Sequence, residues 1–187
     1  MTAELSILHV GYANDRVAGT VTLIRDEGRI IVVDPGMVAD RSLILQPLLA
    51  AGVPADDVTD VVISHHHPDH TVNIALFPNA VVHDFMASYE HDVWTDHDPG
   101  DRALTSSVQL LGTPGHTAED LSTAVTTADG LVVLTHLWWS SAGPADDPFA
   151  PDATVLAASR ARVLSLSPVL IVPGHGDSFV PGPDTPQ

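Results

Sequence analysis

The sequence predicts a layered α/β fold within a single domain. Short segments rich in β-branched and apolar residues occur in both halves of the chain, and each half also holds a helical segment. This order of elements is typical of sheets covered by helices, and it does not suit a helical bundle or an all-β barrel. A chain of 187 residues is long enough for one substantial core. We therefore expect one domain over residues 1–180 and a loose tail, "PGPDTPQ", over residues 181–187.

The first half is predicted to be mainly strands. Pro47 is expected to bend the one helix of this half, over residues 41–53, and Gly52 is expected to end it. A turn at residues 34–36 is expected to end the buried strand that begins at Gly28. The other strands are expected over residues 4–10, 19–25, 57–64 and 79–85.

The second half begins with a polar stretch, residues 86–105, that reads as a long surface loop with scattered aromatic residues. A helix is expected over residues 152–166, with Asp152 as its N-cap. The remaining strands are expected over residues 106–112, 121–127, 130–135 and 168–174.

Four of the predicted strands lead into a histidine. Those histidines are His65, His116, His136 and His175. In layered α/β folds, functional sites gather where loops leave the carboxyl ends of strands. We therefore expect the four imidazoles to meet at one place.

The spacing of the histidines in the stretch "SHHHPDH", residues 64–70, suits the binding of two neighbouring cations. Residues two apart in an extended chain point the same way, so His65 and His67 can face one cation. Pro68 then turns the chain, which lets Asp69 and His70 face a second position nearby. We expect His116 to complete the first site and His175 the second.

These motifs resemble the metallo-β-lactamase superfamily. "SHHHPDH" is similar to its H-x-H-x-D-H signature, and the agreement continues in order through "VVDPG", "TPGHT" and "VPGHG". The resemblance implies an αβ/βα four-layer sandwich of two mixed β-sheets flanked by helices, with a metal-hydroxide site at one sheet edge. It also implies zinc as the expected cofactor, one or two ions per chain, with Fe²⁺ as the alternative. Nitrogen-rich ligand sets of this kind do not suit magnesium or calcium.

One position departs from the family pattern. The family places an aspartate that bridges two metals at the end of the strand 130–135, whereas this chain has His136. A neutral imidazole adds no negative charge between two cations, so we expect their repulsion to weaken one site. The tighter site is expected at His65, His67 and His116, and the weaker one at Asp69, His70 and His175. Whether His136 joins either site is left open, and Asp146 or Asp147 is a further candidate for the missing carboxylate.

The other histidines are not expected to be ligands. These are His9, His66, His83, His91 and His97.

The expected reaction is hydrolysis by a metal-bound hydroxide. A divalent ion makes hydroxide available near neutral pH, and Asp69 is placed to orient it and to pass on its proton. An ester, thioester, lactone or phosphodiester substrate suits this chemistry, and Asp34 is expected to support the ligand loops. Two other classes remain open: a mononuclear iron oxygenase of the persulfide dioxygenase kind, and a non-catalytic metal-binding protein.

The net charge of the chain limits which partners we expect it to bind. The formal net charge is −17, and all seven basic residues are arginine, so strong binding of nucleic acid is not expected. An arginine patch of Arg102, Arg160 and Arg162 would change this, but a solvated helix face is the preferred interpretation of Arg160 and Arg162. No secretory or membrane segment is predicted, so a cytoplasmic protein is the default expectation. The resemblance also implies that a homodimer can form.

Several aromatic side chains are candidates for the surroundings of the site. Trp138 and Trp139 directly follow His136, and Met86, Tyr89 and Trp94 are candidates for a lid. Burial in the core is an equally good interpretation of all five.

Overall fold

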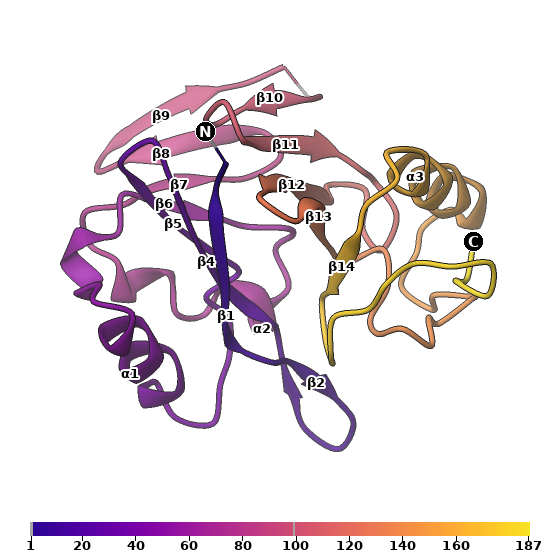
Figure 1. Ribbon diagram of the computed structural model, residues 1–187, viewed down its shortest axis with the longest axis horizontal. Helices are drawn as coiled ribbons and strands as arrows, with labels where there is room; N and C mark the ends of the chain where they lie inside the picture. The colour runs from indigo at the N-terminus through magenta and orange to yellow at the C-terminus, as the bar shows by residue number, and fades with distance from the viewer. Residues whose placement is uncertain (1, 99) are drawn as a thin grey trace.

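The computed structural model describes residues 2–98 and 100–187, and it contains two mixed β-sheets with helices on their outer sides (Figure 1). The first sheet has the order β1-β4-β5-β6-β7-β8-β9, and the second has the order β10-β11-β12-β13-β14. A small hairpin, β2-β3, lies apart from both sheets.

The elements have these bounds. The first sheet consists of β1 (Glu4–His9), β4 (Val21–Asp26), β5 (Arg29–Val33), β6 (Asp60–Val62), β7 (Val81–His83), β8 (Ala87–Glu90) and β9 (Val93–Asp96). The second consists of β10 (Arg102–Ala103), β11 (Val108–Gly112), β12 (Leu121–Thr127), β13 (Gly130–Thr135) and β14 (Leu170–Pro173). The hairpin is β2 (Tyr12–Ala13) and β3 (Val17–Ala18). The α-helices are α1 (Ser42–Ala50), α2 (Pro68–Thr71) and α3 (Ala153–Ser165), and the 3₁₀ turns are η1 (Ala55–Asp57) and η2 (Ile74–Leu76).

The alternation of side chains along each strand divides the core into layers. In β5, Ile31 and Val33 belong to the central cluster between the sheets, whereas Val32 belongs to an outer cluster with Ile44 and Leu48 of α1. Successive residues of a strand point to opposite faces, so one apolar strand can serve both layers. Helix α1 therefore covers the outer face of the first sheet.

The second sheet repeats this arrangement with the other long helix. In β13, Val132 and Leu134 pack in the central cluster, whereas Val133 packs outward with Leu156 and Val163 of α3. The resulting order is helix, sheet, sheet, helix. The predicted αβ/βα sandwich is confirmed.

Helix α3 begins where the sequence predicts. The Asp152 side chain accepts hydrogen bonds from the backbone N–H groups of Thr154 (2.8 Å) and Val155 (3.4 Å). Helix α1 ends at Ala50 with Pro47 inside it, and Gly52 follows with a positive φ of 77°. A left-handed backbone just after a helix is the usual place for glycine.

The predicted long loop at residues 86–105 is wrong. This stretch forms β8, β9 and β10, and β8 pairs with β9 in antiparallel register with Tyr89 opposite Trp94. Every residue of β9 is exposed, so no apolar alternation marked it as a strand. Cross-strand aromatic packing, with the Tyr89 and Trp94 ring centroids 4.6 Å apart, helps to hold the hairpin together.

The C-terminal residues contact the second half of the molecule. The indole nitrogen of the buried Trp138 donates to the Pro186 carbonyl at 2.7 Å. The division into one domain over residues 1–180 and a loose tail stays a prediction. Among the described residues, no helix is long and apolar enough to cross a membrane.

Two parallel strand pairs deliver their carboxyl ends to the same edge of the sandwich. Strand β5 pairs with β6 (Val33 opposite Val62), and β13 pairs with β14 (Thr135 opposite Pro173). The loops that follow these strands carry Asp34, the histidine stretch, His136 and His175. Ligand sites of α/β sheets form at such an edge.

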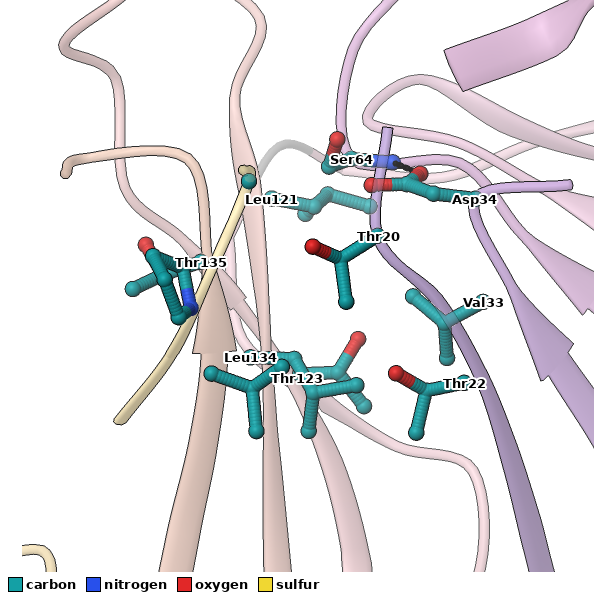
Figure 2. A pocket seen from close by; sticks show the side chains of 12 residues that line it. Thr20, Thr22, Val33, Asp34, Ser64, Leu121, Thr123, Leu134 and Thr135 are labelled. Atoms are coloured by element: carbon teal, nitrogen blue, oxygen red, sulfur yellow. Dashed lines mark hydrogen bonds between the residues drawn. The ribbon is translucent and has the colours of Figure 1, made fainter. Parts of the chain in front are cut away.

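The space between the two sheets below this edge is nearly filled. A cavity of about 10 Å³ remains, lined by both polar side chains, such as Thr20 and Thr22, and apolar ones, such as Leu134 (Figure 2). This volume suits at most one water molecule, so no substrate fits there. A substrate must bind outside this space, above the sheet edge.

Candidate metal centre

Six imidazoles gather at this edge. His65, His67 and His70 come from the first half of the chain, and His116, His136 and His175 come from the second. The ring centroids lie 4.6 Å apart for His65–His67, 4.9 Å for His65–His116, 4.2 Å for His116–His136, 4.8 Å for His70–His136 and 5.0 Å for His136–His175. The four strand ends that the sequence singles out therefore meet in space.

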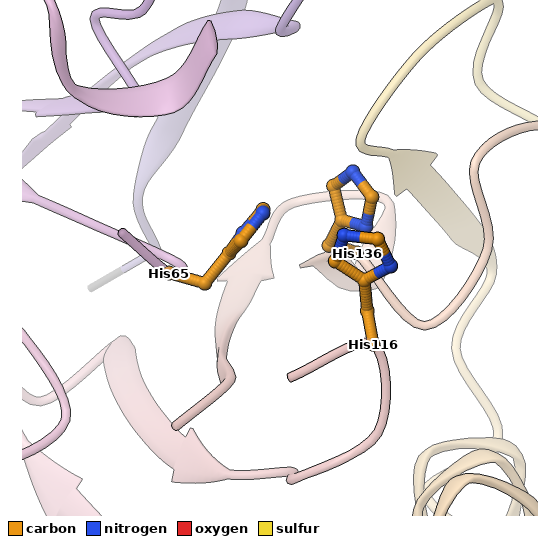
Figure 3. A group of neighbouring side chains, drawn as sticks. All are labelled: His65, His116 and His136. Atoms are coloured by element: carbon orange, nitrogen blue, oxygen red, sulfur yellow. The ribbon is translucent and has the colours of Figure 1, made fainter. Parts of the chain in front are cut away.

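Imidazole nitrogens face one another at the first predicted position. The Nδ1 atom of His67 lies 3.0 Å from His65 Nε2 and 3.1 Å from His116 Nε2. His65, His116 and His136 each offer a nitrogen within 4.8 Å of the others, and Figure 3 shows their rings turned toward a common space.

The second predicted position is built in the same way. His70, His136 and His175 offer nitrogens within 4.8 Å of one another, and His136 Nε2 lies 3.2 Å from His175 Nε2. The Asp69 carboxylate adds an oxygen, Oδ2, at 3.3 Å from His70 Nε2 and 3.6 Å from His175 Nε2. His136 is common to both three-histidine groups.

Four of these rings are held from behind through Nδ1. The partners are Ser64 Oγ for His65 (3.0 Å), Asp34 Oδ2 for His70 (2.9 Å), Asp147 Oδ2 for His116 (2.7 Å) and the Ala18 carbonyl for His175 (2.8 Å). Such contacts fix the orientation of a ring and leave its Nε2 free for a metal. This is the hydrogen-bond pattern of metal-ligating histidines.

Asp34 supports the first ligand loop, as the sequence predicts. Its Oδ1 atom accepts from the Ser64 backbone N–H at 2.7 Å while Oδ2 contacts His70 (Figure 2 shows the Ser64 bond). One carboxylate therefore positions both ends of the histidine stretch.

The turn that carries Asp69 is packed against two other loops. The Asp69 carbonyl accepts hydrogen bonds from the backbone N–H groups of Gly19 and Met37, both at 3.1 Å. A β-carbon on Gly36 would lie 1.6 Å from the same carbonyl oxygen, so only glycine fits there. Pro68 begins the short helix α2, where its fixed φ suits the first turn.

Burial sets the charge state of the cluster. Burial, together with the neighbouring imidazoles, lowers the pKa of His65 and holds that of His136 well below its usual value. Burial also lowers the pKa of His116, although Asp147 opposes the shift. His70 differs, because Asp34 and Asp69 outweigh its burial and raise its pKa to about 9.

The donor set fits a transition-metal ion. His136 Nδ1 is buried without a hydrogen-bond partner among the described residues. Leaving such an atom unsatisfied costs about 1–3 kcal/mol, and a coordinated cation would remove that cost. Clustered imidazole nitrogens with one carboxylate suit zinc or iron better than magnesium or calcium.

Comparison with known proteins gives the family. The family model described as "Metallo-beta-lactamase superfamily" matches residues 14–107. Metallo-beta-lactamase domain-containing protein 1 of Xenopus laevis is 33% identical over 199 residues, which cover 94% of this chain and 81% of that protein. This chain belongs to the metallo-beta-lactamase superfamily.

Solved structures of other proteins have the same fold as this chain. A chain from Thermotoga maritima, described as a metallo-beta-lactamase, matches with a TM-score of 0.75 at 23% identity over 97% of this chain and all of that one. An N-acyl homoserine lactone hydrolase, solved with its product at the catalytic metal centre, matches with a TM-score of 0.69 at 19% identity, covering 93% of this chain and 92% of that one. At these identities the likeness concerns the fold alone.

Within this metallo-beta-lactamase site, all seven predicted ligands lie together. They are His65, His67, Asp69, His70, His116, His136 and His175. Their role as ligands, and the catalytic role of Asp69, stay predictions.

Two of the excluded histidines have other partners. His66 Nε2 lies 3.0 Å from Asp84 Oδ2, and His83 Nε2 lies 2.8 Å from Asp60 Oδ1. Neither His66 nor His83 belongs to either three-histidine group.

Asp147 does not take the place of the missing carboxylate. It binds the outer nitrogen of His116 and accepts from the Trp139 indole at 2.8 Å, so it supports a histidine from behind. Sequence reasoning also missed Ser64 as the partner of His65, since one serine before a histidine carries no specific signal.

A hollow of about 340 Å³ opens over the histidines. It is lined by Ala13, Asn14, Val17, His67, Asp69, His116, His136, Trp139, Phe149 and His175. Trp139 is thus beside the site as predicted, whereas Trp138 is fully buried in the core. The proposed lid of Met86, Tyr89 and Trp94 is not supported, because none of the three lines this hollow.

The interpretation of Arg160 as a solvated residue is wrong. Its side chain is buried and donates to the carbonyls of Leu137 (2.9 Å), Pro144 (2.6 Å) and Ala145 (2.9 Å). It fixes the loop that follows His136, which no pattern within the helix could reveal.

Proposed function

We propose that this protein is a metal-dependent hydrolase that acts on small ester, thioester, lactone or phosphodiester substrates. The observation that carries the proposal is the set of imidazoles oriented from behind, with their other nitrogens converging on the floor of an open hollow. Zinc is the expected cofactor and Fe²⁺ the alternative.

The proposed ligands form two sets. One is His65, His67 and His116, the other is Asp69, His70 and His175, and His136 is within reach of both. A divalent ion bound there would lower the pKa of a water and polarise a carbonyl or phosphoryl oxygen.

Asp69 is the proposed general base and acid. Its carboxylate faces the hollow, and hydrogen bonding and charge from His70 outweigh its partial burial and lower its pKa to about 2. It is therefore ionised at neutral pH and can accept a hydrogen bond from the attacking water. Transfer of that proton to the departing group completes hydrolysis.

The lactone hydrolase neighbour supports this reaction class. That protein holds its hydrolysed product at its catalytic metal centre, on the same fold. The likeness concerns the fold, so the substrate of this chain must be measured.

The test combines metal analysis with turnover. Purified protein, its chelated form and the His116→Ala variant are assayed against p-nitrophenyl esters and bis-p-nitrophenyl phosphate beside an oxygen electrode. We expect hydrolysis by the metal-loaded protein and a loss of at least about 100-fold in the other two samples. Equal activity in all three would overturn the proposal.

Two other results would also reject hydrolysis. Oxygen consumption with a thiol persulfide and no ester turnover would indicate the iron oxygenase. Retained metal with neither activity would indicate a metal-binding protein without catalysis.

A further inference from the structure

The hollow over the histidines has one aromatic wall. Trp139 and Phe149 stack with ring centroids 5.8 Å apart and an interplanar angle of 29°. Phe149 also lies 5.8 Å from the ring of His67 and 5.5 Å from the ring of His116. This wall therefore borders the atoms at which reaction is proposed.

Phe149 is held at the surface although its side chain is apolar. Phe149 is 60% exposed, and Val17, which also lines the hollow, is 38% exposed. Neighbouring apolar side chains that stay exposed within a hollow rimmed by polar residues are a common mark of a ligand-binding groove. The wall and Val17 together offer an apolar surface that the fold itself leaves uncovered.

Asp147 fixes this wall relative to the histidines. Its Oδ1 accepts from the Phe149 backbone N–H at 2.9 Å, and its Oδ2 accepts from the Trp139 indole at 2.8 Å. The same Oδ2 holds His116 at 2.7 Å. The aromatic pair is thus a built part of the site, with its position tied to a predicted ligand.

Away from the proposed metal, the side chains of the hollow offer no basic partner for a negatively charged part of the substrate. Among the described residues that line it, none is arginine, and the whole chain has no lysine. Apart from the histidines, Asp69 is the one residue of acidic or basic type among the described residues that line it. An adjoining hollow of about 480 Å³, which shares Trp139 and His175, also lacks arginine and carboxylate side chains.

We propose that this hollow binds an uncharged acyl group of the substrate, with Phe149 and Trp139 as the residues that determine its length. This inference rests on the hydrolase function proposed above and narrows it to neutral acyl esters or lactones. A volume of about 340 Å³ suits a short or medium chain, since small-molecule sites start near this size.

The test is a series of p-nitrophenyl esters in which only the acyl chain grows. Complete burial of a methylene favours binding about fourfold, so this half-open surface is expected to give about twofold per methylene. From acetate to hexanoate, kcat/KM should rise about sixteen-fold. The monosuccinate ester, with a terminal carboxylate, should be at least about tenfold poorer than the butyrate of equal length.

Phe149→Ala is the decisive variant. It should reduce the ratio of kcat/KM for hexanoate to that for acetate to below about fourfold, because the longer chain loses more apolar contact than acetate does. Val17→Ala should reduce the same ratio less, and it provides a second variant if the first is unstable. The matched control is Trp94→Ala, which removes an aromatic side chain that is 61% exposed and does not line the hollow.

A binding measurement separates the two proposals. Calorimetry with acetohydroxamic and hexanohydroxamic acids reports chain-length preference without turnover. If no ester is hydrolysed but the hexano compound binds more tightly and Phe149→Ala abolishes that preference, the hydrolase proposal fails and the acyl site stands. If esters are hydrolysed with no chain-length dependence, or with equal dependence in Phe149→Ala, the acyl site is refuted.

Discussion

His136 occupies the position at which the resemblance leads us to expect an aspartate. Its ring is buried and uncharged, and it is shared by both three-histidine groups. A carboxylate at this position would add negative charge between two cations, whereas a neutral imidazole adds none. The charge balance of the site therefore depends on this one side chain.

His136→Asp should increase the amount of retained metal. We expect the unchanged protein to keep fewer than two ions per chain after extensive dialysis, and the variant to approach two, because the carboxylate reduces cation repulsion. Elemental analysis measures both. His66→Asp makes the same change at a histidine bound to Asp84 and serves as the control. Two equally retained ions in the unchanged protein would contradict the argument.

Asp147→Asn should weaken metal binding without unfolding the protein. The amide cannot supply the negative charge that now holds His116, and loss of such a supporting contact costs about 10–100-fold in affinity. Competition with a chromogenic chelator measures the change, and circular dichroism checks the fold. Exposed Asp146→Asn is the matched control. Unchanged affinity in Asp147→Asn would show that His116 is positioned by packing alone.

At the scale of elements, one buried carboxylate joins three parallel strands of the first sheet. Asp60 of β6 accepts from Arg29 of β5 at 2.7 Å and contacts His83 of β7 at 2.8 Å. Burial raises the pKa of Asp60, but the hydrogen bonds from His83 and Thr59 and the charge of Arg29 outweigh it, so the pKa lies below its ordinary value. This strand leads directly into the histidine stretch.

The contribution of Asp60 to stability should disappear in acid. A carboxyl with a lowered pKa in the folded state stabilises the protein above its unfolded pKa, and this stability is lost as the pH falls through the folded value. Asp60→Asn should reduce the free energy of unfolding by about 2 kcal/mol at pH 7, and by progressively less below about pH 4. Urea unfolding across this range measures it, with exposed Asp57→Asn as the control. A difference that stays constant down to pH 2 would argue against an ionised Asp60.

The elements that the sequence could predict are those with a buried face. Val32 and Val133 stand between inward-facing neighbours, and such apolar runs mark strands covered on both sides. Strand β9 has no buried residue, so its pairing with β8 depends on a neighbour that no local pattern reveals. Arg160 was misjudged for the same reason, because its acceptors lie in a loop far along the chain.

At the scale of the whole molecule, most arginine side chains are engaged by acceptors of the same chain. Six of the seven donate to acceptors of the described residues: Arg25 to Ala51, Arg29 to Asp60, Arg41 to Asn73, Arg102 to Asp84, Arg160 to Leu137 and Arg162 to Gly112. With a formal charge of −17, little positive surface remains for phosphate groups.

We therefore expect no binding of single-stranded RNA at physiological salt. Fluorescence polarisation with a labelled oligonucleotide should give no change up to about 100 μM protein, which is the range of weak non-specific binding. A dissociation constant in the low micromolar range that weakens with added salt would contradict this expectation. The metal-free and metal-loaded forms should be compared, since bound cations alter the local charge.

The ligand positions could be predicted because they follow from local spacing in the sequence. The groups that hydrogen-bond to the ligands could not, because they come from distant segments. His65 and His67 follow from the alternation of an extended chain, and His116 and His175 follow strand ends. Asp147 and the Ala18 carbonyl reach the rings from distant segments, and Phe149 carries no signal in the sequence. Only the packed molecule reveals them.

The division of the histidines between the two sheets links chemistry to architecture. The loops of each sheet supply three of the six rings. An ion bound by histidines of both sheets would therefore cross-link the two halves of the sandwich. A substitution that weakens packing in the central layer, for example at Leu134, would move the histidines of the two sheets apart without changing any ligand. Metal affinity and the stability of the packing between the two sheets would then change together.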